Sequence, residues 1–211
     1  MFPCDGRDLM KKSILCAVAL AAALLPVSGA SGVPAQTIKN LNTAFQGESN
    51  ASNRYAAFAK KAEAEGLGQV AKLFRAASAS EAIHRDTHKA AIIKLGGTVD
   101  SFKLDEVVPG TTAENLKAAI KGESYERDTM YPEFLAAAKA EDAKPAIRAF
   151  QFAAAAEKEH AKLYQLALDQ LGKNPPQDYY VCQVCGMTLT ALPAKKCPVC
   201  HNGLDEFKKI N

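Results

Sequence analysis

Two short motifs pair a carboxylate with an imidazole at helical spacing: Glu81-Ala-Ile-His84 and Glu157-Lys-Glu-His160. Side chains three residues apart on a helix project from the same face, so each motif can offer two ligands to one metal ion. A further glutamate precedes each motif, Glu48 by 33 residues and Glu123 by 34. Two helical hairpins that each supply a Glu and a Glu-x-x-His form the ligand set of a carboxylate-bridged dimetal centre in a four-helix bundle.

These glutamates, together with Glu126, occupy core-facing positions of the expected helices. Buried carboxylates are costly when unpaired and repel one another when close, so we expect metal cations among them. Carboxylate and imidazole ligands together favour iron or manganese over magnesium. A two-hairpin set needs one glutamate from the third helix, and Glu123 supplies it. Glu126, one turn further on, is a surplus ligand that would let a metal exchange between Glu126 and a histidine.

Three tyrosines, Tyr55, Tyr131 and Tyr164, fall within two turns of these positions. Tyr55 and Tyr131 are candidates to hydrogen-bond the ligand carboxylates or a metal-bound oxygen, with simple space filling as the alternative. His88 also falls on a core-facing position. We interpret it as a core or surface histidine rather than a ligand.

Apolar residues recur at helical spacing from residue 36 to residue 171. Breaks are expected at Gly66-Leu67-Gly68, between residues 96 and 110, and at Lys144-Pro145. The pattern therefore predicts four long helices with connections that are short, long and short. That order is typical of two antiparallel hairpins joined by a crossover, an all-α four-helix bundle of the ferritin-like class.

The C-terminal part has a different composition. A linker at 172–178 contains Pro175-Pro176, and a small module of strands and loops is expected over 179–211. Within it, Cys182-Gln-Val-Cys185 and Cys197-Pro-Val-Cys200 have the spacing of a tetrathiolate metal site. The neighbouring aromatic residues Tyr179, Tyr180 and Phe207 favour an iron–thiolate electron carrier. A structural zinc site and a pair of disulfides are the alternatives.

The N-terminus has the features of an export signal. Lys11 and Lys12 precede an apolar run at 14–27 and the small residues Ser28-Gly29-Ala30. We interpret residues 1–30 as a secretory signal peptide, cut after Ala30 or Ala35, with a retained anchor as the alternative. The mature protein is then expected in the periplasm or another exported location rather than in the cytoplasm, without membrane attachment. A net charge of +3 gives no indication of nucleic-acid binding.

The whole chain from about residue 36 to residue 211 resembles rubrerythrin. The motifs that carry the resemblance are the following: Phe45-Gln-Gly-Glu48 with Tyr55, Glu81-Ala-Ile-His84, Gly122-Glu123-Ser-Tyr-Glu126, Glu157-Lys-Glu-His160-Ala-Lys-Leu-Tyr164, and the two Cys-x-x-Cys pairs.

The resemblance implies a di-iron centre in the bundle and one iron in the Cys4 module, which together reduce hydrogen peroxide to water. It implies that Glu81 and Glu157 bridge the two irons. Glu48 and Glu126 would then be terminal ligands of the first iron, and Glu123 and His160 of the second. His84 would replace Glu126 in the reduced state. Family members form head-to-tail homodimers, in which the Cys4 iron of one subunit lies near the di-iron site of the other.

Two features depart from the family pattern. His201 follows Cys200 where glycine is usual, at a position that often needs a positive φ. The export signal is the second departure, and it implies a periplasmic redox protein as the electron donor. Three other functions remain open at this point: a ferroxidase or iron-handling protein, a non-enzymatic zinc-knuckle binding protein, and a manganese catalase, which would need no electron-carrying tail.

Overall fold

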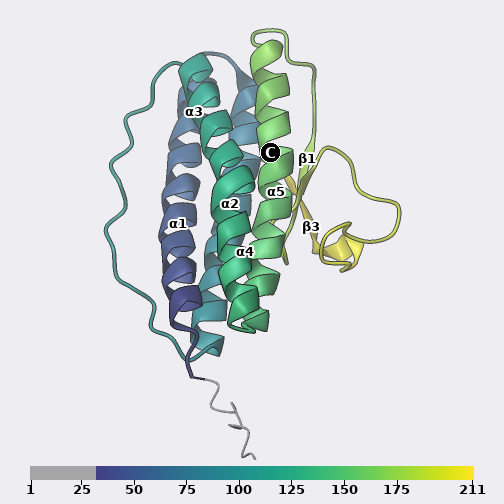
Figure 1. Ribbon diagram of the computed structural model, residues 1–211. Coiled ribbons are helices and arrows are strands. Elements are labelled where there is room, and N and C mark those ends of the chain that lie inside the picture. Colours follow the sequence, from purple (N-terminus) through teal and green to yellow (C-terminus); the bar gives the residue numbers. More distant parts are fainter. Residues whose placement is uncertain (1–31) are drawn as a thin grey trace, which may run out of the picture. The chain divides into compact units, whose positions relative to one another are not determined.

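A computed structural model describes residues 32–211; the expected signal peptide lies outside these residues. The described chain folds into a long helical bundle followed by a small β module (Figure 1). No helix in this part of the chain is both long and apolar enough to cross a membrane. The helices are α1 (Ala35–Ala64), α2 (Gly68–Lys94), α3 (Thr112–Tyr125), the π-helical turn η1 (Glu126–Met130), α4 (Tyr131–Ala140) and α5 (Lys144–Asp169).

The third helix of the bundle differs from the expectation of one regular helix. A π-helical turn divides it into α3 and α4, and the backbone N–H of Tyr131 bonds to the carbonyl of Glu126, five residues earlier. Such turns are rare and are frequently found at functional sites. Here the turn begins at Glu126, the surplus candidate ligand, so the irregular backbone falls at the level of the candidate site.

The connection between α2 and α3, residues 95–111, runs along the length of the bundle (Figure 1). Two asparagines of α1 hold it. Asn42 donates to the carbonyl of Thr98 (3.0 Å), and Asn50 donates to a carboxylate oxygen of Asp105 (2.8 Å). Thr111 and Glu114 then form a capping box that starts α3. The long connection predicted from the sequence is thereby confirmed as an ordered crossover.

The apolar core of the bundle consists of two clusters with a polar layer between them. One cluster is built around Tyr55, Phe74 and Tyr164, and the other around Tyr131 and Phe150. On each long helix, the candidate ligands lie in sequence between residues of the two clusters. This arrangement holds the charged side chains at one level of the bundle.

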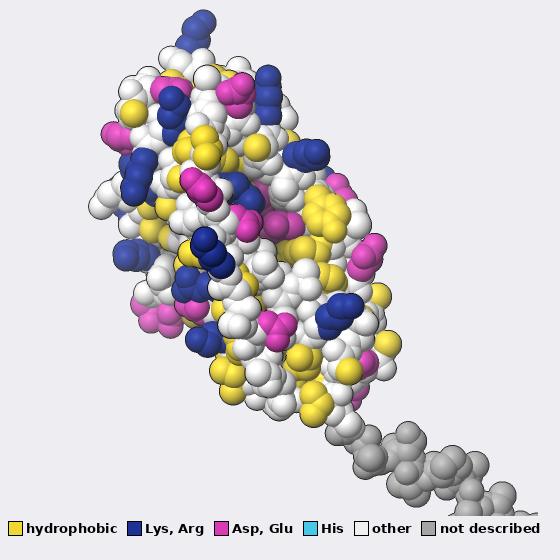
Figure 2. Space-filling view, turned by 90° about the vertical axis from the view of Figure 1, so that its left-hand side faces the viewer, with side chains coloured by type: hydrophobic (Ala, Val, Ile, Leu, Met, Phe, Trp, Pro, Cys, Tyr) yellow, Lys and Arg dark blue, Asp and Glu magenta, His cyan; other side chains and the backbone are white. Residues whose placement is uncertain are grey.

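The C-terminal module contains β1 (Tyr179–Cys182), β2 (Thr188–Leu189), the 3-10 turn η2 (Leu204–Glu206) and β3 (Phe207–Ile210). The three strands pair antiparallel in the order β2-β1-β3. Phe152 of α5 packs against the module's buried cysteines and Met187. The face of the protein seen in Figure 2 carries basic and acidic side chains interspersed with apolar ones.

Candidate metal centres

The bundle brings the predicted carboxylates and imidazoles into two overlapping groups. Within each group, the ligand atoms all lie within 4.8 Å of one another. Glu81 and Glu157 belong to both groups, the position that a bridging carboxylate requires. The first group adds Glu48 and His84, and the second adds Glu123 and His160; all six side chains are buried. The geometry is that of two adjacent metal positions sharing two carboxylates.

Glu126 does not belong to either group, and part of Glu126 remains accessible to solvent. His84 fills the fourth place in the first group instead. This is the ligand arrangement that the family resemblance implies for the reduced state. Glu126 nevertheless lies close enough for the carboxylates of Glu48 and Glu123 to act on it: burial first, and then these charges, raise the pKa of Glu126.

Burial and mutual repulsion govern the ionisation of the carboxyl groups. Burial, followed by the charges of Glu157 and Glu81, raises the pKa of Glu123 to about 8. Burial is also the largest cause that raises the pKa of Glu48. Burial also acts to raise the pKa of Glu157. The charges and hydrogen bonds of His84 and His160 outweigh burial, so the pKa of Glu157 is lowered. Without metal, the site therefore keeps protons on some carboxyls, and cations would displace them.

The buried oxygens test whether metal ions fit this site. Among the residues that the structure describes, Glu48 Oε2 and Glu123 Oε2 have no hydrogen-bond partner. Glu81 Oε1 and Glu157 Oε1 face only the Nδ1 atoms of His160 and His84, which are candidate metal ligands themselves. An unpartnered buried carboxylate oxygen is costly. Each of the four belongs to a candidate ligand, and together they supply the oxygen donors that hard metal ions prefer. The residues present therefore fit a pair of metal ions.

Both candidate tyrosines hydrogen-bond candidate ligands. The hydroxyl of Tyr55 donates to Glu123 Oε1 at 2.5 Å, and the hydroxyl of Tyr131 donates to Glu48. Because the Tyr131 proton goes to Glu48, its oxygen accepts from Nε2 of His88, 3.1 Å away. His88 is thus a buried core histidine that orients Tyr131, and burial lowers its pKa to about 3. Tyr164 packs against Tyr55 in the core.

The four cysteines of the module form the second candidate centre. Their sulfur atoms lie within 4.8 Å of one another, with Cys182 Sγ 3.6 Å from Cys200 Sγ and Cys185 Sγ 3.6 Å from Cys197 Sγ. A disulfide requires about 2.05 Å, which excludes the predicted disulfide alternative. A tetrahedral ion with sulfur ligands at about 2.3 Å would place neighbouring sulfurs about 3.8 Å apart, so the cluster has the size of a tetrathiolate site.

The second cysteine pair ends in an unusual turn. His201 has φ of 61°, which confirms the predicted left-handed backbone at this position. The turn brings the next side chain back to the site: Asn202 Nδ2 lies 3.3 Å from Cys200 Sγ. Cys200 is the only one of the four cysteines that is not fully buried, so a side chain outside the thiolate set contacts its most accessible sulfur.

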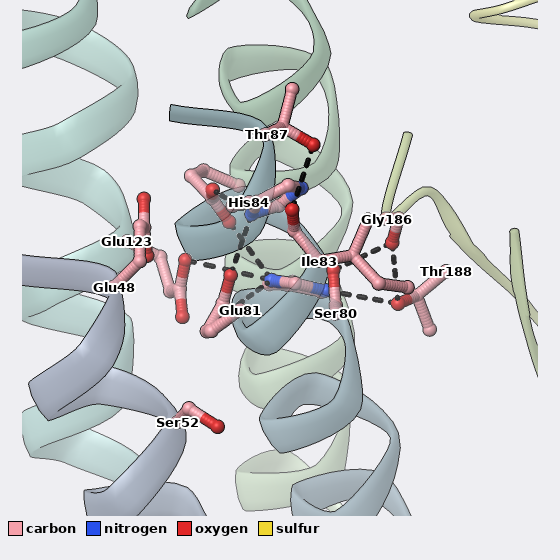
Figure 3. A network of polar contacts seen from close by, with 12 residues as sticks. Glu48, Ser52, Ser80, Glu81, Ile83, His84, Thr87, Glu123, Gly186 and Thr188 are labelled. Atoms are coloured by element: carbon pink, nitrogen blue, oxygen red, sulfur yellow. Dashed lines mark hydrogen bonds and ion pairs between the residues drawn. The ribbon is translucent and has the colours of Figure 1, made fainter. Parts of the chain in front are cut away.

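Contacts between the two centres were not anticipated from the sequence. His84 Nε2 lies 3.2 Å from the carbonyl oxygen of Cys185, and His160 Nε2 lies 3.0 Å from Thr188 Oγ1. The hydroxyl of Ser80 donates to the carbonyl of Gly186 at 2.6 Å. Figure 3 shows Gly186 and Thr188 on the opposite side of His84 from Glu48 and Glu123. Serine, glycine and threonine carry no distinctive spacing, so no sequence signal marks them.

A bundle with paired Glu and Glu-x-x-His ligands, followed by a Cys4 module, defines a ferritin-like dimetal protein with a rubredoxin-like domain. The rubrerythrin family model matches residues 39–168. The chain belongs to the rubrerythrin family, which confirms the resemblance seen in the sequence. Its cofactors are the di-iron centre of the bundle and the iron of the Cys4 module.

Several relatives support this assignment over nearly their full length. Rubrerythrin-2 of Clostridium acetobutylicum is 36% identical and covers 82% of this chain and 96% of its own length. Nigerythrin of Nitratidesulfovibrio vulgaris is 32% identical over 81% of this chain and 85% of its own.

Solved structures of ferritin-like proteins have the same fold as this chain. Nigerythrin in its fully reduced, all-ferrous state aligns with a TM-score of 0.73 at 32% identity, over 82% of this chain and 86% of that one. The bacterioferritin BfrA of Mycobacterium tuberculosis aligns with a TM-score of 0.59 at 20% identity, over 65% of this chain and 87% of its own, and shares the fold. The protein is therefore a di-iron oxidoreductase of a family that acts in oxidative stress.

Proposed function

We propose that the protein is a peroxidase that reduces hydrogen peroxide to water at the di-iron centre, with electrons relayed through the Cys4 iron. The observation that carries the proposal is the hydrogen bond between His84, a candidate ligand of the first centre, and the peptide carbonyl of Cys185, a candidate ligand of the second. A ferroxidase or a manganese catalase would not need a thiolate site whose cysteine backbone is hydrogen-bonded to a ligand of its active centre.

The candidate ligands in the two groups are Glu48, Glu81, His84, Glu123, Glu157 and His160, and those of the module are the four cysteines. Glu126, outside both groups, is the further candidate predicted from the sequence. When bound, the two bundle irons supply the two electrons that, with two protons, convert one hydrogen peroxide into two water molecules. Glu81 and Glu157 would hold both irons, and Glu126 would be the alternative to His84 as a ligand of the first iron. The tyrosine hydroxyls that donate to Glu123 and Glu48 hold protons at the ligand carboxylates.

A single anaerobic experiment tests the activity. The iron-loaded protein is fully reduced, one equivalent of hydrogen peroxide is added, and the visible absorption of the oxidised Cys4 iron is followed. Fast return of the absorption with peroxide, and much slower return with dioxygen, is the expected result. Equal rates with both oxidants would favour the ferroxidase alternative. A colourless protein with zinc in the module would favour a non-enzymatic binding protein.

We further propose that the protein acts after export, with a periplasmic redox protein as electron donor. The basic residues Lys11 and Lys12 and the apolar run at 14–27 support the proposal. N-terminal sequencing of the protein from fractionated cells tests it. A new N-terminus after Ala30 or Ala35 in the periplasmic fraction is expected, and an intact N-terminus in the cytoplasm would contradict it.

A head-to-tail homodimer is the proposed assembly. A groove of about 770 Å³ between α1 and α2 is lined by alanines and serines, with charged side chains among them: Ser52, Ala56, Ala59, Lys60, Glu63, Ala64, Arg75, Ser78, Ala79 and Ala82. Small residues allow helices of a second copy to approach closely. In the described chain, the module contacts its own bundle through Ser80 and Gly186. A head-to-tail dimer would make these contacts between subunits by exchanging modules.

Mixed dimers distinguish exchange from contact within one chain. One subunit would carry Cys197→Ser in the module and the other Glu157→Ala in the bundle, so that neither is active alone. Exchange predicts recovered peroxide turnover after mixing, because the intact module of one subunit then serves the intact bundle of the other. No recovery from dimers shown to be mixed would indicate contact within one chain.

A further inference from the structure

The imidazoles of His84 and His160 share one orientation. Each directs Nδ1 toward the carboxylates: His84 Nδ1 lies 2.7 Å from Glu81 and 3.1 Å from Glu157, and His160 Nδ1 lies 2.9 Å from Glu157 and 3.0 Å from Glu81. Each directs Nε2 toward the C-terminal module. The nitrogen available to metal is therefore Nδ1 in both rings, and Nε2 is the outer nitrogen.

The module places a hydrogen-bond acceptor opposite each outer nitrogen. An imidazole that binds metal through Nδ1 carries its proton on Nε2 and needs an acceptor there. The carbonyl oxygen of Cys185 faces His84 Nε2, and the hydroxyl oxygen of Thr188 faces His160 Nε2. Thr188 directs its own proton toward the carbonyl of Gly186, 3.4 Å away, which leaves its oxygen free to accept. Both contacts thus hold a proton on Nε2, so that Nδ1 is the nitrogen that gives up its proton when metal binds.

The fit between module and bundle is tight at this point. Gly186 has φ of 76°, and a Cβ atom there would lie 2.3 Å from His84 Nε2. The bond from Ser80 to the carbonyl of Gly186 holds the two surfaces together from the bundle side. Both Thr188 and Ser80 are fully buried. Water therefore cannot readily replace these acceptors while the module is docked.

We propose that the C-terminal module completes the metal centre of the bundle by supplying the outer hydrogen-bond acceptors of both histidines. Thr188 is a positioning residue that acts through His160, and the Cys185 carbonyl acts likewise through His84. The bundle's affinity for metal then depends on a docked module, besides any role of the module in electron transfer. The proposal rests on the candidate ligand set and not on the reaction, and it holds whether the module belongs to the same subunit or to a partner.

Metal binding by the full chain tests the proposal without any measurement of activity. The thiolate site is first filled with one equivalent of Zn²⁺, which soft ligands select, and the bundle is then titrated with Mn²⁺, with free Mn²⁺ followed by electron paramagnetic resonance. Loss of an outer hydrogen bond to a ligand histidine typically costs about 10- to 100-fold in metal affinity. Thr188→Val should therefore weaken Mn²⁺ binding by about that factor, and Thr188→Ser, which keeps the hydroxyl, should restore it.

Thr190→Val is the matched control. Thr190 lies in the same module, and its backbone carbonyl, which the substitution keeps, accepts from Gln177. Unchanged affinity in Thr188→Val, or equal losses in Thr188→Val and Thr190→Val, would overturn the proposal. Failure of the unaltered chain to bind Mn²⁺ would overturn the ligand set as well.

A second pair of variants covers the case in which Thr188→Val does not fold. Ser80→Ala removes the docking bond from the bundle side and leaves the module unaltered. Ser78→Ala is the control on the same helix. The hydroxyl of Ser78 donates to the carbonyl of Ser52 on α1 and not to the module. Weaker Mn²⁺ binding in Ser80→Ala alone is expected. Equal affinity in the two variants would overturn the proposal.

Discussion

His84 Nε2 lies 3.2 Å from the carbonyl oxygen of Cys185, so one hydrogen bond joins a candidate ligand of the di-iron centre to a candidate ligand of the Cys4 iron. An electron passing between the two metal centres would cross this one hydrogen bond, and the rest of its path would follow covalent bonds of the imidazole ring and of Cys185. Such a short route suits a module that returns electrons to the bundle. The relationship depends on a close approach that only a glycine at position 186 allows.

Gly186→Ala should therefore slow electron transfer between the two centres. The added Cβ would lie 2.3 Å from His84 Nε2 and 3.0 Å from Ser80 Oγ, so the module must shift away. We expect the Cys4 iron to keep its visible absorption but to be reoxidised by peroxide at least about tenfold more slowly, because electron transfer must cross a wider gap. Stopped-flow absorption of the reduced protein mixed with peroxide measures this rate.

Gly172→Ala is the control for that variant. Gly172 has nearly the same backbone conformation, with φ of 78°, but a Cβ there would meet no atom of the described residues within 4 Å. Both substitutions carry the cost of a positive φ, and only Gly186→Ala adds the contact with His84. Equal reoxidation rates in the two variants would show that the close approach is not part of the route.

Glu126→Ala tests ligand exchange at the first metal position. Because His84 already completes the first group without Glu126, the variant should keep most of its bundle iron. It should lose peroxide turnover by about 10- to 100-fold if exchange is part of the cycle, a size typical for changes around a metal ligand. Iron content and peroxide consumption are measured together. Glu133→Ala, an exposed glutamate of α4, is the control, and turnover equal to this control would remove the exchange from the mechanism.

The spacing of ligands and apolar residues predicted the bundle and the two groups of candidate ligands well. Glu-x-x-His motifs depend only on helical periodicity, and the matched intervals between Glu48 and Glu81 and between Glu123 and Glu157 follow from hairpin geometry. The Cys-x-x-Cys pairs are similarly local. These features could be predicted because residues close in sequence, or symmetric about a short turn, determine them.

The π-helical turn and the junction between the centres could not be predicted in the same way. A single five-residue π turn starting at Glu126 hardly disturbs the periodicity of the surrounding α-helix. Ser80 and Thr188 lie 108 residues apart, and their roles follow from how the module docks. Docking is a tertiary property, and serine and threonine are too common on helices and strands for their types to indicate it.

The metal-free protein should lose stability as pH rises. The pKa of Glu123 is about 8 in the folded state against a reference of 4.5, so between these values the folded state holds a proton that the unfolded state has released. The stabilising contribution of this carboxyl is complete below about pH 4.5 and is lost as pH rises through about 8. His88 does not interfere above about pH 6.5, because burial lowers its pKa to about 3 and keeps it neutral.

Urea unfolding of chelator-treated protein across about pH 6.5 to 8 measures this dependence. Glu123→Gln should flatten it, since the amide does not titrate. Iron-loaded protein should show the opposite slope, because metal binding requires deprotonated carboxylates and is favoured by higher pH. A metal-free protein that became more stable toward about pH 8 would contradict the assignment of protonated carboxyls to this site.

The amide of Asn202 should raise the reduction potential of the Cys4 iron. Its Nδ2 donates to Cys200 Sγ at 3.3 Å, and hydrogen bonds to thiolate sulfurs stabilise the more electron-rich reduced state. Asn202→Ala should therefore lower the potential, whereas His201→Gly should leave it nearly unchanged, because it keeps the amide. His201→Gly should also stabilise the module by about 1 kcal/mol, because glycine adopts the φ of 61° without steric cost. A redox titration of the visible absorption measures both variants, and equal potentials in Asn202→Ala and the unaltered protein would exclude the amide as a determinant.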